Sequence, residues 1–214
     1  LLADDHVLVA EGIQKLLEPE YELVGIVADG RSLVAAAAKL QPDIVVVDIS
    51  LPLLNGLDAS QQLKKNNPNL KIIVLTMHSE PNLVTQAFRV GVSGYVLKQS
   101  VGSELVQAIR EVVKGRTFVS PMVAQSLVDQ AVNPSSASAP GEVNVGFAQT
   151  LSSRQREVLQ LVAEGKARKE IASILNVSVK TVEFHKTRIM KELRLRTAAE
   201  LTKYAIAAGL TSIH

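Results

Sequence analysis

The stretch IVVVDISLPLLNG, residues 44–56, decides the fold of this chain. Its first four residues are apolar and rich in β-branched side chains, in a run too short for a helix and typical of a strand buried on both faces of a parallel sheet. Asp48 ends the run, at the carboxyl edge where open α/β sheets place their functional groups. Pro52 and the pair Asn55-Gly56 then predict a loop before the next helix.

Strand-like and helix-like segments alternate over the first half of the chain. Strands are predicted at residues 1–3, 21–27, 43–48, 71–76 and 94–97. Amphipathic helices are predicted at residues 7–17, 31–40, 57–66, 81–90 and 103–114. Five such units imply an α/β, flavodoxin-like fold, in which a five-stranded parallel sheet carries helices on both faces.

The remaining sequence predicts a linker and a second, all-α domain. Residues 133–149 lose their periodicity and fill with Ser, Ala, Pro and Gly, as a flexible tether does. Four short helices follow, with Ser152 and Gln155 as a possible capping box for the first and a tight turn between the second and third. This pattern is typical of a helix-turn-helix domain. The predicted divisions are a first domain at 1–116, a linker at 117–149 with a helix at about 121–131, and a second domain at 150–214.

Charge is distributed unevenly along the chain. Residues 1–116 carry 11 Lys and Arg against 13 Asp and Glu, residues 117–149 carry 0 against 2, and residues 150–214 carry 12 against 6. The net charges of −2, −2 and +6 predict that the last segment binds a polyanion. The chain has no cysteine and no apolar run long enough for a membrane span, so we expect a cytoplasmic protein that does not bind membranes.

Five functional side chains are predicted to meet at the carboxyl edge of the sheet. Asp4 and Asp5 follow the first strand, Asp48 ends the third, Thr76 ends the fourth and Lys98 follows the fifth. Three carboxylates this close require a cation, and hard oxygen ligands favour Mg²⁺. Asp48 could then accept a phosphoryl group, whose oxygens Lys98 and Thr76 would contact. Taken alone, Asp48 reads more simply as a helix cap, but the five residues together favour a phosphoryl-transfer site.

These residues, together with Leu51-Pro52, Asn55-Gly56 and the segment GYVLK at 94–98, resemble the receiver domain of bacterial response regulators. The resemblance implies that Asp48 accepts phosphate from a sensor histidine kinase and that Thr76 and Lys98 sense the phosphoryl group. It also implies that Mg²⁺ is bound by Asp5, Asp48 and the main-chain carbonyl of Ser50, with Asp4 assisting. Tyr95 matches the aromatic switch position of that family.

The helix predicted at 179–193 has one apolar and one polar face. Val182, Ile189 and Leu193 share the buried face, with His185 and Lys186 near its edges. The opposite face then carries Lys180, Glu183, Phe184, Thr187, Arg188 and Lys191. A helix of this kind after a turn suits the major groove of DNA, although a solvated surface helix would show a similar pattern.

Residues 151–201 resemble the LuxR-type DNA-binding domain, and the whole chain resembles the NarL/FixJ group of response regulators. The matching positions include Leu151, Glu157, Gly165, Ile171, Leu175, Ser178, Lys180-Thr181-Val182, His185, Ile189 and Ala199-Glu200-Leu201. The resemblance implies that helix 179–193 is the recognition helix, that His185 contacts phosphate, and that the last helix pairs two copies on promoter double-stranded DNA. Arg194-Leu195 stands where the family commonly has Gly-Val, which predicts a tighter turn or an extra phosphate contact.

We therefore expect a phosphorylation-controlled, dimeric transcription regulator that is not an enzyme. One rival is a phosphatase of the haloacid dehalogenase type, but that class carries its nucleophile in an Asp-x-Asp motif on the first strand, and here Asp4 and Asp5 are adjacent. A second rival is a DNA-binding protein whose receiver never takes phosphate. The complete set of pocket residues argues against it.

Overall fold

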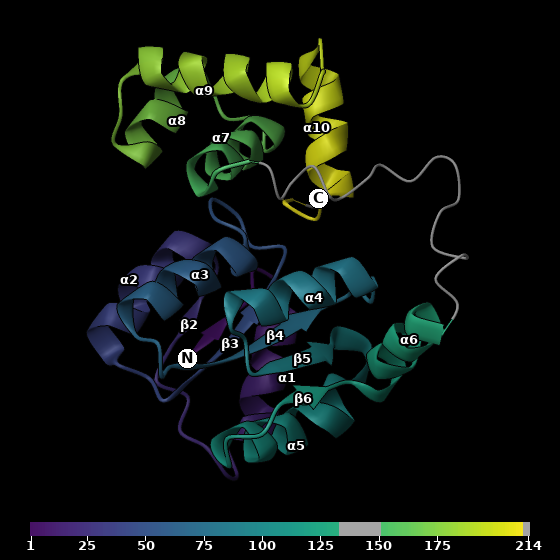
Figure 1. Cartoon of the computed structure of the whole chain (residues 1–214). Helices are drawn as coiled ribbons and strands as arrows, with labels where there is room; N and C mark the ends of the chain where they lie inside the picture. The colour runs from purple at the N-terminus through teal and green to yellow at the C-terminus, as the bar shows by residue number, and fades with distance from the viewer. Residues whose placement is uncertain (133–150, 212–214) are drawn as a thin grey trace. The chain divides into compact units, whose positions relative to one another are not determined.

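The computed structural model describes residues 1–132 and 151–211. The chain divides into two compact units, Leu1–Ala139 and Pro140–His214, which are described separately below (Figure 1).

The first unit is built on a parallel sheet with strand order β2-β1-β3-β4-β5-β6 (Figure 1). The strands are β1 (Leu2–Ala3), β2 (Ile26–Val27), β3 (Ile44–Asp48), β4 (Lys71–Thr76), β5 (Gly94–Leu97) and β6 (Phe118–Val119). The predicted number of five strands was therefore wrong, because two residues of β6 extend the sheet beside β5. Such a short pairing leaves no periodic signal in the sequence.

The predicted strand at residues 21–27 is reduced to Ile26 and Val27. These two residues form the edge of the sheet and pair only with β1, in the register Leu2↔Ile26 and Ala3↔Val27. Because β1 itself is only two residues long, the residues preceding Ile26 have no strand beside them with which to continue the ladder.

Helices cover both faces of the sheet, as predicted (Figure 1). They are α1 (Val7–Leu17), α2 (Gly30–Leu40), α3 (Gly56–Asn66), α4 (Pro81–Val90) and α5 (Val101–Val113), with a 3₁₀ turn at Lys98–Ser100. Buried side chains of α1 and α5 pack on one face of the sheet, and those of α2, α3 and α4 pack on the other. In β3, Val45 and Val47 join the second cluster and Val46 joins the first, so this strand is buried on both faces.

Helix α6 (Pro121–Val132) is part of the first unit and packs against α4. Its Val123 is fully buried within the same apolar cluster as Leu83 and Ala87 of α4. Residues 118–132 fall within the predicted linker, yet they add a strand and a helix to the receiver-like unit. The remaining predicted linker residues, 133–149, lie outside the described residues.

The second unit contains α7 (Ser153–Ala163), α8 (Arg168–Leu175), α9 (Val179–Glu192) and α10 (Ala198–Ala207). Its core is formed by Leu151, Val158, Leu161, Ile171, Leu175, Val182, Ile189, Leu201 and Ala205. The predicted capping box is confirmed, since the Ser152 hydroxyl accepts from the Gln155 N–H and the Gln155 side chain accepts from the Ser152 N–H.

The turn between α8 and α9 is tight because Asn176 adopts a left-handed conformation, with φ 51°. Asn tolerates this conformation better than most residues. The Ser178 hydroxyl then caps α9 by accepting from the Thr181 N–H at 3.1 Å. Among the helices of residues 1–132 and 151–211, none has the length and apolar character that crossing a membrane requires.

Candidate functional site

The strand register places four of the five predicted pocket residues side by side. Ala3 pairs with Val47, Asp48 with Leu75, and Thr76 with Leu97. Asp4 follows Ala3 and Lys98 follows Leu97, so Asp4, Asp48, Thr76 and Lys98 all reach the same carboxyl edge of the sheet. Asp4, Asp48 and Thr76 are buried there, and Lys98 follows Leu97 at the end of β5.

Lys98 bridges two of the carboxylates. Its Nζ lies 2.7 Å from Asp4 Oδ2 and 2.8 Å from Asp48 Oδ2, and its side chain is only 9% exposed. One buried cation therefore balances part of the charge of two buried carboxylates, which would otherwise repel each other. Lys98 and Asp48 therefore lie in direct contact at the sheet edge.

Burial and the neighbouring charges together shift the pKa values of Asp48 and Lys98. Burial raises the pKa of the Asp48 carboxyl, Lys98 opposes this through its charge and hydrogen bond, Asp4 adds to the rise, and the net direction is upward. Burial by itself lowers the pKa of Lys98, but the two carboxylates outweigh it and the pKa is raised. Lys98 thus stays cationic beside Asp48, as a group that stabilises transferred negative charge must.

Asp5 and an unpredicted residue, His6, complete the acidic cluster. Ligand atoms from Asp4, Asp5, His6 and Asp48 all lie within 4.8 Å of one another. The His6 Nδ1 lies 2.8 Å from Asp5 Oδ1 and 3.3 Å from Asp4 Oδ1. Three carboxylates at this spacing form the hard oxygen donor set that suits Mg²⁺, so the residues present fit that ion. The sequence offered one signal for His6, its position directly after the two aspartates.

Thr76 and Tyr95 both contact the main chain of His78. The Thr76 hydroxyl accepts from the His78 N–H at 3.2 Å, and the Tyr95 hydroxyl donates to the His78 carbonyl at 2.8 Å. Thr76 and Tyr95 are fully buried, and burial raises the pKa of the Tyr95 phenol, with a smaller contribution from Glu80. The predicted phosphate sensor and the predicted switch residue are therefore both hydrogen-bonded to His78, two residues after the end of β4.

A second buried link joins the end of β5 to β6 and α5. The Ser120 hydroxyl accepts from the Leu97 N–H at 3.1 Å and donates to the Glu104 carboxylate. The Ser120 N–H also donates to the Tyr95 carbonyl at 2.9 Å. Residues 118–120 thus hold the segment that carries Tyr95 and Lys98. The sequence did not predict this role, because Ser120 and Glu104 come together only through the tertiary fold.

The loop after β3 is packed tightly beneath Asp48. The Gly56 N–H donates to the Ile49 carbonyl at 2.8 Å, and a Cβ atom at Gly56 would lie 2.0 Å from the Asp48 carbonyl oxygen. The Asn55 side chain caps α3 by accepting from the Asp58 N–H at 2.9 Å. The Ser50 N–H donates to Asp48 Oδ1 at 3.2 Å. The expected role of the Ser50 carbonyl as a metal ligand stays a prediction.

Helix α9 presents most of the predicted DNA-contacting side chains to solvent. Its exposed residues include Lys180, Glu183, Phe184, Thr187, Arg188 and Lys191, while Thr181, His185 and Lys186 are half-buried. The ring of His185 meets Phe184 edge-on at a centroid distance of 5.6 Å. Burial lowers the pKa of His185, and the charges of Arg154 and Arg188 lower it further. A neutral, half-buried His185 would attract a phosphate less strongly than a cationic side chain, and its phosphate contact stays a prediction.

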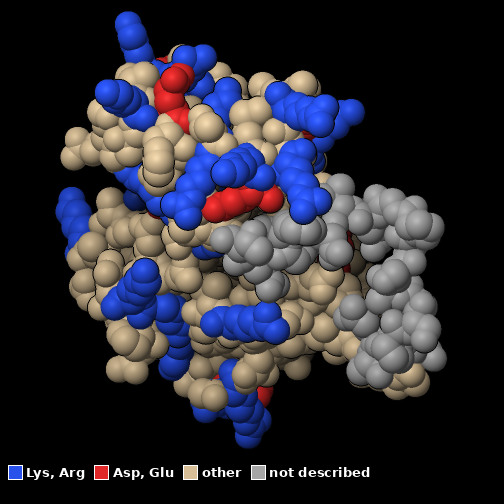
Figure 2. All heavy atoms as spheres, turned by 45° about the horizontal axis from the view of Figure 1, so that its top comes forward, with Lys and Arg blue, Asp and Glu red and all other residues tan. Residues whose placement is uncertain are grey.

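Two ion pairs involve α9. Arg168 of α8 pairs with Glu183, and Arg188 Nε lies 3.2 Å from Glu192 Oε1. The contact of Arg168 with α9 depends on the packing of α8 against α9 and carried no signal in the sequence. Lys and Arg side chains outnumber Asp and Glu on the face seen in Figure 2.

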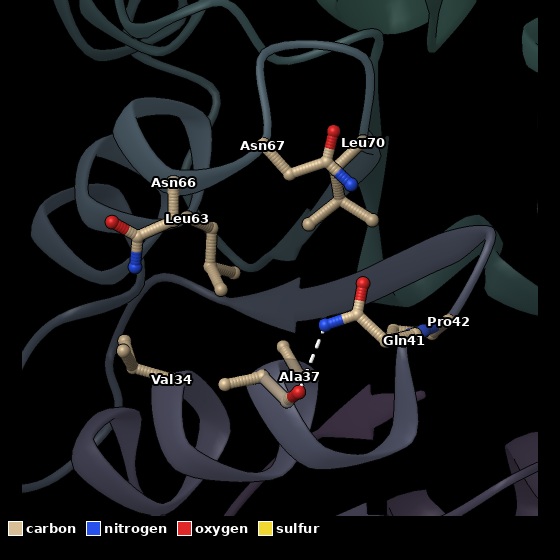
Figure 3. A pocket seen from close by; sticks show the side chains of 9 residues that line it. Val34, Ala37, Gln41, Pro42, Leu63, Asn66, Asn67 and Leu70 are labelled. Carbon is tan, nitrogen blue, oxygen red and sulfur yellow. Dashed lines mark hydrogen bonds between the residues drawn. The ribbon is translucent and has the colours of Figure 1, made fainter.

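A small cavity lies at the opposite edge of the sheet from Asp48. It has a volume of about 200 Å³ and lies between the carboxyl ends of α2 and α3 (Figure 3). Its lining includes Val34, Ala37, Gln41, Leu63 and Asn67. The Gln41 amide donates to the Ala38 carbonyl at 2.8 Å. No charged side chain lines the cavity, so it lacks the groups that phosphoryl chemistry requires.

Comparisons with known proteins agree with this geometry. Residues 1–110 match the family model described as response regulator receiver domain, and residues 149–205 match that of bacterial regulatory proteins, luxR family. The oxygen regulatory protein NreC of Staphylococcus carnosus is 38% identical over 98% of this chain and 97% of its own length. NreC of Staphylococcus aureus strain JH9 is 37% identical over the same shares.

Solved structures show the same relationship. A structure of the Salmonella typhimurium response regulator RcsB has a TM-score of 0.63 and 30% identity, covering 97% of this chain and 96% of that one. A complex of RcsB with DNA has a TM-score of 0.57 and 30% identity, covering 96% of both chains. With its acidic pocket bridged by Lys98 and its helix-turn-helix unit, this chain belongs to the two-component response regulators that join a receiver domain to a LuxR-type DNA-binding domain.

Proposed function

We propose that phosphorylation of Asp48 by a sensor histidine kinase controls the binding of α9 to promoter DNA. The observation that carries this proposal is the contact of Lys98 with both Asp48 and Asp4 at 2.8 and 2.7 Å, beside Asp5. This arrangement provides a nucleophilic carboxylate, a cation for the transferred group and a donor set for a metal ion at one sheet edge.

In the proposed transfer, an Asp48 oxygen forms a bond to phosphorus while the bond from phosphorus to the donor histidine nitrogen breaks. The electron pair of that bond stays on the histidine nitrogen. Asp4, Asp5 and Asp48, with the Ser50 carbonyl, would hold Mg²⁺, which when bound neutralises charge on the phosphoryl oxygens. Lys98 exchanges its contact with the Asp48 carboxylate for one with a phosphoryl oxygen, and the Thr76 hydroxyl donates to another.

The output proposed for this state is a change in DNA binding. The phosphoryl group adds about −1.5 to −2 charge at the sheet edge, and movement of Thr76 changes the hydrogen bonds that the His78 main chain shares with Tyr95. We propose that two copies, paired through α10, then bind paired half-sites in the bacterial cytoplasm. A structure of two RcsB dimers bound to two DNAs supports the dimeric mode by analogy. The predicted domain limits remain part of this proposal, with β6 and α6 added to the first domain.

The test of phosphorylation uses a small acyl phosphate, Mg²⁺ and intact-protein mass spectrometry. The wild-type chain should gain one phosphoryl group, and Asp48→Asn should gain none. Asp43→Asn is the matched control, because Asp43 is exposed and lies one residue before the opposite end of β3. Labelling of Asp48→Asn to the wild-type level would contradict the assignment of Asp48.

The test of DNA binding uses the salt dependence of affinity for a promoter fragment. Replacing one phosphate-contacting cation of α9, such as Arg188 or Lys191, should reduce the slope of log K against log salt by about 1. Lys39, on α2 of the first unit, provides the control for loss of a single charge. Unchanged affinity in every α9 cation variant would show that another element contacts the DNA.

A further inference from the structure

One exposed stripe of α9 has an apolar centre between two cationic ends. Lys180, Phe184, Thr187 and Lys191 are spaced by four, three and four residues. At about 100° per residue, these four positions fall within an arc of about 60° on the helix surface. All four are exposed, and the Phe184 side chain is 60% exposed.

The stripe lies on the side of α9 that faces away from the core. Val182 and Ile189, which are each 1% exposed, anchor the opposite side of the helix in the second unit. Because these two residues supply the packing of α9, the apolar surface of Phe184 contributes little to the core. A large aromatic ring in this position suits contact with a partner outside the domain.

The charges on and beside the stripe indicate what that partner is. Glu183 is paired with Arg168, so the acidic group nearest to Phe184 is offset by a cation within the domain. Among the residues of 151–211 that the structure describes, Lys180 and Lys191 form no ion pair. Two lysines that flank an apolar centre complement a polyanion that offers apolar groups between its phosphates.

The diameter of a helix matches the major groove of B-DNA, which is about 12 Å wide and admits an α-helix lengthwise. Lys180 and Lys191 are eleven positions apart, which is about 16 Å along a helix, and they lie at the two ends of the stripe. With Phe184 and Thr187 over the base edges, the long lysine side chains reach phosphates that flank the groove. The apolar group that a base presents in this groove is the C5-methyl of thymine, which Phe and Thr side chains contact.

We propose that Phe184 and Thr187 are specificity-determining residues that contact thymine methyl groups at the centre of each half-site. This inference rests on the proposed function, because it assumes that α9 enters the major groove. It adds a chemical prediction, namely that the operator carries thymine at positions where hydrogen-bonding side chains make no base contact. Lys180 and Lys191 position the helix through phosphate contacts and carry no direct sequence information.

The experiment begins by selecting bound sequences from a random double-stranded DNA library with the phosphorylated full-length chain. Each thymidine of the selected operator is then replaced, one at a time, by deoxyuridine, which removes the methyl group and keeps the hydrogen bonds of the base pair. Affinity is measured by fluorescence anisotropy at fixed salt. At one or two positions per half-site, the wild-type chain should bind about fourfold more weakly, as expected for one buried methyl group.

Variants connect this loss to the two side chains. Two variants are used: Phe184→Ala, and Thr187→Ser, which keeps the hydroxyl and removes the methyl. Each variant should bind the operator more weakly than the wild-type chain does. Deoxyuridine at the contacted position should then cause no further loss. Val179→Ala is the matched control, because Val179 is also apolar and 39% exposed but lies off the stripe; it should keep the full fourfold sensitivity. Thermal unfolding confirms that each variant folds.

The outcomes separate the inference from the function beneath it. If no sequence is enriched, the chain does not bind DNA specifically, and both proposals fail. If an operator is enriched but no deoxyuridine substitution weakens binding, or the loss persists unchanged in both stripe variants, the proposed function stands and the thymine contact is wrong. An operator without thymine near the centre of its half-sites would also overturn the inference.

Discussion

Replacing Gly56 by Ala sets two measurable effects against each other. Gly56 is the first residue of α3, where Ala is the better helix former by up to about 1 kcal/mol. A Cβ atom, however, would lie 2.0 Å from the Asp48 carbonyl oxygen, 2.8 Å from its carbonyl carbon and 3.0 Å from the Ile49 Cα. All three atoms belong to the backbone, so no side chain can rotate to relieve the contact.

The steric effect should exceed the gain in helix propensity. The closest approach is more than about 1 Å shorter than an ordinary van der Waals contact, and overpacking a tight site costs about 1–3 kcal/mol. We therefore expect Gly56→Ala to lower the free energy of unfolding of the first unit by about 1–2 kcal/mol. The two closest of these atoms belong to Asp48 itself, so the rate of labelling by an acyl phosphate should also fall.

Gly12→Ala provides the control for helix propensity. Gly12 lies inside α1, and a Cβ there meets no atom within 4 Å. This variant should gain up to about 1 kcal/mol and keep the wild-type labelling rate. Urea unfolding measures both free energies. Equal or increased stability of Gly56→Ala, with unchanged labelling, would refute the argument that this glycine is required by the close approach of the chain to Asp48.

Three further predictions concern other parts of the molecule. Arg194 adopts φ 55°, which costs a non-glycine residue about 1–2 kcal/mol, so Arg194→Gly should raise the urea midpoint of the second unit; a lower midpoint would show that the arginine side chain stabilises the turn. Ser120→Ala leaves the buried Leu97 N–H without its acceptor and should cost about 1–3 kcal/mol in calorimetry, whereas a neutral result would mean that the β6 contact is dispensable. The pKa of His185 is lowered in the folded state, so the unfolded chain binds the extra proton more readily. The second unit should therefore lose stability as the pH falls below about 6.5. In His185→Gln, the free energy of unfolding measured against pH should lack this loss.

Much of the fold could be predicted because its signals are local. The bounds of α1, α4 and β5 agree with the predicted ranges, since each is marked by its own periodicity or by a residue such as Pro81 or Gly91 at its end. Strand β6 escaped prediction because two residues carry no period. Strand β2 was predicted to be longer than it is, because most of the predicted run at residues 21–27 has no neighbouring strand with which to pair.

The candidate site was predictable to the extent that it follows from strand ends. Asp4, Asp48 and Lys98 meet because parallel strands end at one edge, which the sequence alone implies. The contacts of Ser120 with Leu97 and of Arg168 with Glu183 depend on packing between distant segments. The chemical types of Ser120 and Arg168 are ordinary, so no pattern distinguished them beforehand.

The role of His78 has a consequence for how this protein can vary. Thr76 and Tyr95 use the main-chain N–H and carbonyl of His78, and neither bond involves its imidazole. Every amino acid except proline supplies both groups. The residue whose main chain links Thr76 and Tyr95 is therefore free to change in identity while both hydrogen bonds are kept. A comparison of side chains among relatives would pass over this position, although its main chain holds both Thr76 and Tyr95.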